Sequence, residues 1–278
     1  MRSVINHLIQ LQELSLIRDE QKITKGGKHQ EELNASINAM VSGLPGSIQD
    51  SYVKLAKKDH LVVVPVSEGV CAICRMKLPI SLVQIVRIGK EIRSCPNCAR
   101  LLYYPESAPR HVGRKPRRSE PRKPGISRFS SQLLMVPKLE STDKEGVINE
   151  LAYKMEAEGF VNKAEKLVEA ALRRETILST AVDHGLAFPH ARGVEGGGLT
   201  LTLGISKKGI DFDSPDKVLT KLVFFMVIPT AASAFYLKLL AGLTETFMKA
   251  DARKAIITAK DQEKLWKTLI KVTRAAIK

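Results

Sequence analysis

Cysteine is scarce in this sequence, and that scarcity narrows the chemistry open to the chain. Its 278 residues contain only 4 cysteines, and all of them lie in one short segment between Cys71 and Cys98. In a reducing compartment such a close group indicates metal binding, not disulfide bonds.

Long apolar runs are also missing. The longest nearly apolar stretch, residues 222–237, contains Pro229, Thr230 and Ser233 and is too short to span a bilayer comfortably. It predicts instead a buried strand followed by a turn and a helix. The segment after Met1 has a helix-like pattern and lacks the apolar core and cleavage site of a secretory signal. We therefore expect a cytoplasmic protein without a membrane span.

Acidic residues are too few to balance the basic ones. The chain has 29 Asp and Glu against 44 Lys and Arg, a net charge of +15. If the 4 cysteines bind one Zn²⁺ as thiolates, the charge becomes 15 − 4 + 2 = +13. Such an excess attracts nucleic acid, acidic protein surfaces or anionic lipid, but it does not specify a fold. The chain length suits two modest domains, and 44% hydrophobic residues suffice for a globular core.

The first 63 residues predict a helical hairpin. Val4, Leu8 and Leu11 recur at helical spacing, and residues 33–41 repeat this pattern after a break at Gly26-Gly27. The hairpin either packs on neighbouring parts of its own chain or forms a short dimerising coiled coil, and the sequence leaves both open. Residues 61–66 and 82–88 predict short strands, because both runs are rich in β-branched residues.

Residues 105–131 predict an extended, basic, proline-rich linker. Five prolines between Pro105 and Pro124 prevent regular structure, and the basic residues of this stretch exceed the acidic ones by 8 − 2 = 6. The composition is typical of a tether between domains.

Globular patterning returns in residues 132–278. Helices are expected over 144–157 and 163–174, from about Ala234 and from about Asp261, and strands over 199–205 and 222–228. These elements predict an α/β domain in which strands alternate with helices and a mixed sheet is flanked by helices. The whole chain is therefore expected to be a multidomain α+β protein.

The cysteines form two CxxC pairs, Cys71/Cys74 and Cys95/Cys98. Two such turns brought together by a β-hairpin place four thiolates in a tetrahedron, the geometry that Zn²⁺ prefers in closed structural sites. Four sulfur ligands leave no open position, so the site is not expected to be catalytic. Free or redox-active thiols are the alternative interpretation.

The residues around these cysteines, 70–79 and 94–104, resemble the bacterial C4-type zinc-ribbon proteins, in which a longer helical coiled coil precedes the ribbon. The resemblance covers residues 1–104 and places the ribbon at 64–104. It implies an adaptor that binds protein or nucleic acid. Six basic residues permit contact with nucleic acid, but we favour a solvated basic face; they are Arg75, Lys77, Arg87, Lys90, Arg93 and Arg100.

A second informative stretch is residues 174–192, RETILSTAVDHGLAFPHAR. Gly185 permits a tight turn, residues 186–188 form a short apolar strand, and Pro189 restrains the backbone before His190. A neutral imidazole is a competent nucleophile near neutral pH, and Arg174 offers a guanidinium fork for a phosphoryl group. A purely structural histidine is the alternative on these grounds.

The same stretch resembles the active-site signature of enzyme IIA of the fructose/mannitol and nitrogen-regulatory class of phosphotransferase systems: an Arg-Glu pair, Ser-Thr, then Gly-Leu-Ala-Phe-Pro-His. Residues 209–213 and 222–229 also match, so the resemblance covers 132–278. It implies that His190 is phosphorylated, that Arg174 stabilises the phosphoryl group, and that Ser179 and Thr180 line the pocket.

One position departs from that family. Tyr236 stands where the family has a second active-site histidine. A tyrosine hydroxyl can donate one hydrogen bond to a phosphoryl oxygen, but it cannot carry the charge of an imidazolium. Weaker or slower transfer to an enzyme IIB is the expected consequence.

The resemblances together predict a regulatory phosphoryl carrier, not a stand-alone metabolic enzyme. His190 would accept a phosphoryl group from a histidine phosphocarrier protein, and the zinc ribbon would direct the domain to a regulated partner. The IIA component of a sugar-transport system, passing phosphate to an enzyme IIB, is one alternative. A non-catalytic adaptor that binds protein or nucleic acid is the other.

Overall fold

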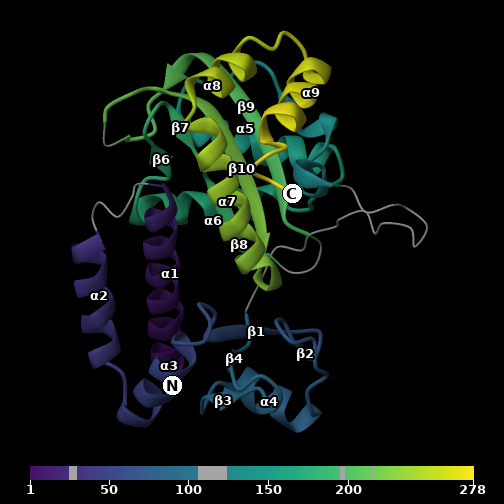
Figure 1. Cartoon of the computed structure of the whole chain (residues 1–278). Helices are drawn as coiled ribbons and strands as arrows, with labels where there is room; N and C mark the ends of the chain where they lie inside the picture. Colours follow the sequence, from purple (N-terminus) through teal and green to yellow (C-terminus); the bar gives the residue numbers. More distant parts are fainter. Residues whose placement is uncertain (25–29, 106–123, 195–197, 215) are drawn as a thin grey trace. The chain divides into compact units, whose positions relative to one another are not determined.

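The computed structural model describes residues 1–24, 30–105, 124–194, 198–214 and 216–278. The chain divides into two compact units, residues 1–107 and 108–278, which are described separately (Figure 1). Most of the predicted linker falls on residues 106–123, outside the described ranges. Among the described residues no helix is both long and apolar enough to cross a membrane.

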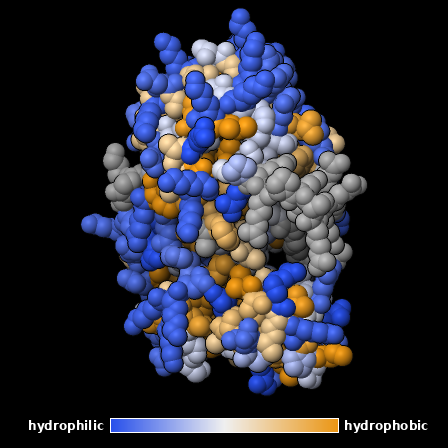
Figure 2. Space-filling model, turned by 45° about the vertical axis from the view of Figure 1, so that its right-hand side comes forward, coloured by the Kyte–Doolittle hydropathy of each residue, from blue (hydrophilic) through white to orange (hydrophobic). Residues whose placement is uncertain are grey.

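The chain is a mixed α+β protein, as predicted, with helices and a mixed sheet in each unit. Hydrophilic residues cover much of the face shown in Figure 2, with apolar residues interspersed among them. That surface agrees with the large excess of charged over aromatic residues in the sequence.

The amino-terminal unit begins with the predicted helical hairpin. Its first two helices pack against each other, and His7 Nε2 lies 2.8 Å from the Met40 carbonyl oxygen across the hairpin. The elements of the unit are α1 (Arg2–Thr24), α2 (Gln30–Ser42), α3 (Gly46–Ala56), β1 (Val63–Ser67), β2 (Val70–Cys71), α4 (Ile80–Ile88), β3 (Arg93–Ser94) and β4 (Leu101–Tyr103).

A small sheet of order β2-β1-β4-β3 follows the hairpin. Strands β1 and β4 pair in parallel, whereas β2 and β3 pair antiparallel with their neighbours. The side chain of Gln12 ties α1 to this sheet, because its Nε2 donates to the Val63 carbonyl at 3.0 Å and its Oε1 accepts from the Val62 and Val63 amides at 2.7 and 2.8 Å. The hairpin therefore packs on its own ribbon, which is one of the two arrangements that the sequence left open.

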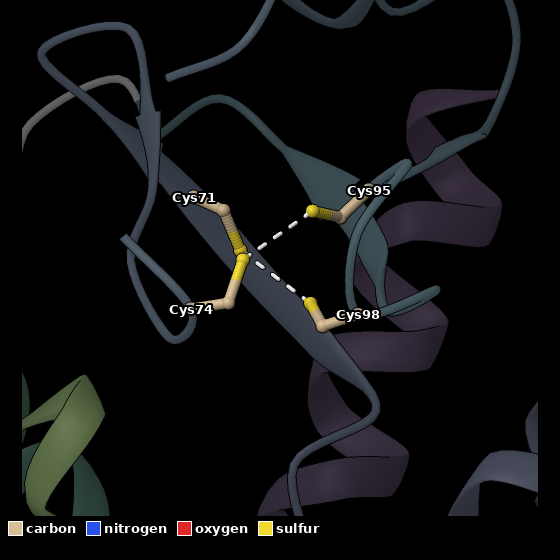
Figure 3. Close-up of side chains that lie close together, drawn as sticks. All are labelled: Cys71, Cys74, Cys95 and Cys98. Carbon is tan, nitrogen blue, oxygen red and sulfur yellow. Dashed lines mark hydrogen bonds between the residues drawn. The ribbon is translucent and has the colours of Figure 1, made fainter. Parts of the chain in front are cut away.

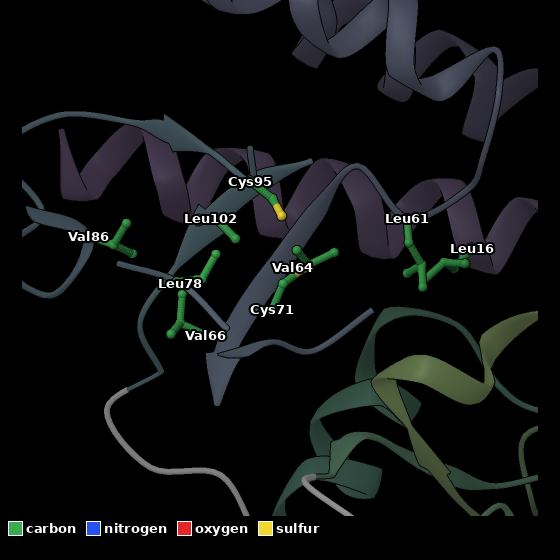
Figure 4. Packing of buried hydrophobic residues seen from close by; sticks show 9 residues of the cluster. All are labelled: Leu16, Leu61, Val64, Val66, Cys71, Leu78, Val86, Cys95 and Leu102. Atoms are coloured by element: carbon green, nitrogen blue, oxygen red, sulfur yellow. The ribbon is translucent and has the colours of Figure 1, made fainter. Parts of the chain in front are cut away.

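The two faces of β1 are buried in different apolar clusters. Val63 belongs to a cluster with Leu8 and Leu11 of α1. Val64 belongs to a second cluster that also contains two of the cysteines and Leu16 of α1 (Figure 4). Helix α1 thus contributes to both cores.

The strand predicted over residues 82–88 is wrong, because these residues belong to helix α4. Pro79 precedes the first turn, where a missing amide costs nothing, and Gly89 ends the helix with a positive φ of 70°. Val86 is buried, and Leu82 and Val83, four and three residues earlier, pack against the same cluster. Helical spacing of the apolar residues therefore prevails over their β-branched preference.

The carboxy-terminal unit contains a larger mixed sheet with helices on both sides (Figure 1). Its described elements are η1 (Gly125–Arg128), η2 (Gln132–Leu134), β5 (Met135–Val136), α5 (Lys144–Ala157), α6 (Ala164–Ile177), β6 (Ala181–Val182), β7 (Leu186–Ala187), β8 (His190–Val194), β9 (Thr200–Ile210), β10 (Thr220–Pro229), η3 (Thr230–Ala232), α7 (Ser233–Phe247), α8 (Ala250–Ile257) and α9 (Gln262–Thr273).

The sheet has the order β5-β9-β10-β7-β6, and β8 pairs with β10 beyond β7. Strand β10 is buried along nearly its whole length, as predicted, because it is paired on both sides and α5 and α7 pack against it. The predicted alternation of helices and strands is wrong: α5 and α6 follow the short strand β5, β6 to β10 come next without a helix between them, and α7 to α9 end the unit. Parallel pairing of Met226 with His190 places the start of β8 beside the carboxyl half of β10.

Candidate functional site

The four cysteines of the amino-terminal unit converge on one point (Figure 3). Their Sγ atoms all lie within 4.8 Å of one another, with Cys71 and Cys98 3.7 Å apart and Cys74 and Cys95 3.6 Å apart. Four sulfurs at the usual Zn–S distance of about 2.3 Å stand roughly 3.8 Å apart at the corners of a tetrahedron. The arrangement is zinc-ribbon-like, and the residues fit a tetrahedral metal ion.

The two CxxC turns share one backbone conformation. In each, the amide of the first cysteine donates to the carbonyl five residues later, at 3.0 Å for Cys71 and 2.8 Å for Cys95. The carbonyl of the same cysteine accepts from the amide four residues later, at 2.9 Å in both turns. The residues that close the turns, Arg75 and Ala99, both have a positive φ of 61°. Two independent segments thus adopt the same loop to direct paired sulfurs at a common centre.

The thiols differ in acidity. Burial raises the pKa of Cys71 to about 12. Burial also acts to raise the pKa of Cys74, but hydrogen bonds from the Asn97 side chain and the Met76 backbone outweigh it and lower the pKa to about 6. A metal that binds all four as thiolates must therefore displace protons from the buried members of the set.

The carboxy-terminal unit holds the candidate nucleophile, His190, at the first residue of β8. Its side chain is buried, with the residue only 1% exposed, but its surroundings are polar. Nδ1 lies 3.0 Å from the Phe188 carbonyl oxygen, which is only an acceptor, so Nδ1 carries the proton of the neutral ring. Nε2 then holds the lone pair and is the nucleophilic atom.

Arg192 contacts that lone pair. Its Nε donates to His190 Nε2 at 3.2 Å. This residue was not selected from the sequence, although alternation along a strand places residues two apart on one face. The Pro-His-Ala-Arg run, with His190 opening a strand, was the signal that could have identified it.

Tyr236, on the first turn of α7, packs against the imidazole. The two ring centroids are 5.2 Å apart at an angle of 45°, and the tyrosine hydroxyl lies 3.4 Å from His190 Nδ1. The guanidinium carbon of Arg192 stands 4.7 Å from the centre of the Tyr236 ring, a cation–π distance. The structure therefore brings together His190, Tyr236 and Arg192.

Arg174 lies in the last turn of α6, which packs against β8. Its side chain is buried, and Nη1 donates to the Leu178 carbonyl at 2.7 Å. This bond joins the guanidinium to the loop that leads from α6 to β6.

Thr180 lies in the same loop, and its hydroxyl donates to Glu175 Oε2 at 2.8 Å while its amide donates to Glu175 Oε1 at 2.9 Å. Its carbonyl accepts from the Phe188 amide at 3.2 Å. Ser179 Oγ donates to the Phe212 carbonyl at 2.5 Å. These two hydroxyls, which the sequence predicted to line the pocket, anchor the loop. Glu175 was not selected from the sequence.

Comparison with known proteins identifies the carboxy-terminal unit. Residues 129–272 match the family described as phosphoenolpyruvate-dependent sugar phosphotransferase system, EIIA 2. The chain is 31% identical over 125 residues to the PTS system fructose-specific EIIABC component of Bacillus subtilis, covering 45% of this chain and only 20% of that protein. It is 30% identical over 129 residues to the PTS system fructose-specific EIIA component of Haloferax volcanii, covering 46% of this chain and 84% of that protein.

A nitrogen regulatory protein of Bradyrhizobium diazoefficiens is 29% identical over 136 residues, covering 49% of this chain and 88% of that protein. Among solved structures, the nitrogen regulatory protein IIA-Ntr of Neisseria meningitidis aligns with a TM-score of 0.48 and 24% identity, covering 52% of this chain and 98% of its own. Because the family match covers more than half of the residues, this chain belongs to the EIIA 2 family of the phosphoenolpyruvate-dependent sugar phosphotransferase system.

Proposed function

We propose that this chain is a regulatory phosphoryl carrier that accepts a phosphoryl group on Nε2 of His190 from a histidine phosphocarrier protein. The observation that carries the proposal is the hydrogen bond of His190 Nδ1 to the Phe188 carbonyl, because it leaves Nε2 as the unprotonated nitrogen. Phosphoryl transfer requires little of a protein beyond an aligned nucleophile and hydrogen-bond donors around the phosphoryl oxygens.

The neighbouring residues have separate roles in this proposal. Tyr236 packs its ring against the imidazole and places its hydroxyl beside Nδ1, and the Arg174 guanidinium stabilises negative charge from α6. Thr180 holds the loop that positions Phe188, and with it the imidazole. Phosphorylation adds negative charge to this face, which changes the partners that it binds.

The amino-terminal unit serves as a targeting module in this proposal. Its helical hairpin (residues 1–63) and C4 ribbon (residues 64–104) are joined through the linker to the IIA domain (residues 132–278). The cysteines hold one structural Zn²⁺, since four thiolates in a tetrahedron leave no position for a substrate. The ribbon then presents the domain to a regulated protein.

The test is phosphorylation with phosphoenolpyruvate, enzyme I and the phosphocarrier, comparing wild type with His190→Ala. We expect acid-labile label on the wild type alone, because acid lability is characteristic of a phosphorus–nitrogen bond. His184, an exposed residue in the turn between β6 and β7, offers the control: His184→Ala should label like the wild type. Equal labelling of wild type and His190→Ala would contradict the assignment.

A sugar-transport IIA component is the second candidate, and the two fructose-specific relatives favour it. The two candidates differ in the step after phosphorylation. A transport component passes the label to an enzyme IIB, whereas a regulatory carrier retains it until a partner or water removes it. Incubating the labelled protein with purified fructose enzyme IIB, and measuring label on each protein, separates the two.

A further inference from the structure

The guanidinium of Arg192 occupies the place that a phosphoryl group on His190 would need. With Nδ1 bonded to the Phe188 carbonyl, only Nε2 has a lone pair for a new bond. Arg192 Nε donates a hydrogen bond to that same atom at 3.2 Å. A hydrogen bond to a ring nitrogen lies along the direction of its lone pair, which is also the direction of a nitrogen–phosphorus bond.

The Arg192 guanidinium and a phosphoryl group cannot both occupy the position next to His190 Nε2. A covalent nitrogen–phosphorus bond is much shorter than the 3.2 Å between the two nitrogens, so the phosphorus atom would lie between them and in collision with Arg192. Arg192 must therefore leave Nε2 before the bond forms. In the resting protein it also lowers the availability of the lone pair, because the electrons are engaged with a donor.

We propose that Arg192 is a further catalytic residue of this site, covering Nε2 in the resting protein and binding the phosphoryl oxygens once His190 is phosphorylated. This proposal rests on the proposed phosphorylation of His190. An arginine is suited to both states, since its planar fork of donors matches phosphate geometry and it keeps its charge at any physiological pH.

Tyr236 fits this scheme as the positioning residue for Arg192. Its ring lies 4.7 Å from the guanidinium carbon and is itself almost fully buried. The ring face attracts the cation without consuming its hydrogen-bond donors, so the guanidinium can turn from nitrogen to phosphate without losing this contact. The positive charge that a tyrosine cannot provide at position 236 is thereby supplied by Arg192.

The transfer step balances without any further reactant. The lone pair of His190 Nε2 forms the new bond to phosphorus, and the phosphorus–nitrogen bond of the donor phosphohistidine breaks with its electron pair returning to the donor ring. The donor ring enters with a proton on its other nitrogen and leaves as a neutral imidazole, while the His190 ring takes up the positive charge. The proton on Nδ1 stays in place and is shared with the Phe188 carbonyl. Arg192 donates its hydrogen bond to Nε2 before the transfer and to the phosphoryl oxygens after it.

The test compares Arg192→Gln and Arg192→Lys with wild type, and with Arg173→Gln as a matched control. Arg173 is an exposed arginine of α6 that pairs with Glu169 at 2.6 Å. Each protein is labelled with phosphoenolpyruvate, enzyme I and the phosphocarrier, and the half-life of the isolated phosphoprotein is measured. Heteronuclear NMR of the His190 ring nitrogens in the unphosphorylated proteins reports the resting contact.

We expect Arg192→Gln to shorten the half-life of the phosphoprotein about tenfold or more, the usual effect of losing a charge-assisted hydrogen bond. Arg192→Lys keeps the charge but loses the planar fork of donors, so its phosphoprotein should have a half-life between those of the wild type and Arg192→Gln. The half-life of Arg173→Gln should match that of the wild type. The Nε2 resonance should move in Arg192→Gln and stay in place in Arg173→Gln.

Equal half-lives for wild type and Arg192→Gln would overturn the phosphate-binding role, and an unchanged Nε2 resonance would overturn the resting contact. A wild type that takes no label at all would overturn the proposed function and this role together. Label on the wild type with equal half-lives overturns the role of Arg192 alone, so the two failures are distinguishable.

Discussion

At the scale of single residues, Thr180 acts on the imidazole through two intermediate contacts. Its hydroxyl and amide hold the buried Glu175 carboxylate, at 2.8 and 2.9 Å. Its carbonyl accepts from the Phe188 amide, and the Phe188 carbonyl accepts from His190 Nδ1. Thr180 is therefore a positioning residue, and its effects should appear first in stability.

Replacing Thr180 by valine tests that role. Valine keeps the shape but removes the hydroxyl, which leaves one oxygen of the Glu175 carboxylate without this donor. Losing a hydrogen bond to a buried charged group costs about 1.5–3 kcal/mol, so the free energy of unfolding should fall by that amount in urea titrations. The labelling rate should fall as well, because the ring loses part of its support.

Thr176 offers a matched control for this change. It is an exposed threonine whose hydroxyl donates to the Arg173 carbonyl at 2.8 Å, so Thr176→Val should cost less than about 0.5 kcal/mol. Thr180→Ser restores the hydroxyl and should recover most of the loss. Equal stability of Thr180→Val and wild type would show that the Glu175 contact contributes nothing.

The individual site residues differ in how far the sequence revealed them. His190 and Tyr236 were selected through their motif, and the structure places them together. Arg192 was missed because the Pro-His-Ala-Arg run identifies it only if His190 opens a strand, and the expected strand ended before Pro189, whereas β8 begins at His190. Thr180 was selected, but its hydrogen-bond partner depends on a loop conformation that local sequence does not specify.

At the scale of elements, helices with strong boundary signals were predicted closely. Helix α5 spans the predicted residues 144–157 because Asp143 accepts from the Gly146 amide at 2.8 Å and fixes its start. Asp261 does the same for α9 through the Lys264 amide at 2.8 Å. Helix α4 was missed because its Ile and Val residues favour strands when considered singly, while its helical nature depends on the core that Val86 reaches.

Proline substitution in α4 distinguishes a helix from the strand first predicted. Gln84 is an exposed residue in the middle of the helix, where proline removes a backbone hydrogen bond and clashes with the preceding turn. We expect Gln84→Pro to lower the free energy of unfolding of the metal-loaded amino-terminal unit by about 3 kcal/mol.

Ile80 provides the control for that substitution. It is the first residue of α4 and 80% exposed, and the first helical position tolerates proline because its amide has no partner within the helix. Ile80→Pro should therefore cost less than about 1 kcal/mol. Similar losses from the two substitutions, measured by urea unfolding, would argue against the helix.

At the scale of the whole molecule, the two units depend on different sources of stability. The carboxy-terminal unit has a sheet whose central strand β10 is buried along nearly its whole length. The amino-terminal unit has only short strands around its cysteines, and Cys71 and Cys95 are themselves members of its core cluster. A metal ion that links the two CxxC turns would therefore stabilise the first unit and leave the second unchanged.

Metal removal should consequently abolish one unfolding transition and leave the other in place. Structural zinc contributes on the order of 10 kcal/mol in small ribbon-like units, which is comparable to the whole net stability of an average domain of about 5–15 kcal/mol. We expect about one zinc per chain by metal analysis. In calorimetry, a strong chelator or Cys95→Ser should remove the transition of the amino-terminal unit.

Acid should act like the chelator. Thiols must lose their protons to bind metal, so lowering the pH to about 5 favours the metal-free form.

His190→Ala supplies the reciprocal control, because it changes the carboxy-terminal unit and should alter neither the zinc content nor the chelator-sensitive transition. Phosphorylation of the wild type should also survive chelation, since the cysteines and His190 belong to different units. Loss of both transitions on chelation, or of neither, would contradict a metal that stabilises the amino-terminal unit alone. Loss of labelling on chelation would instead show that the ribbon takes part in the phosphoryl transfer.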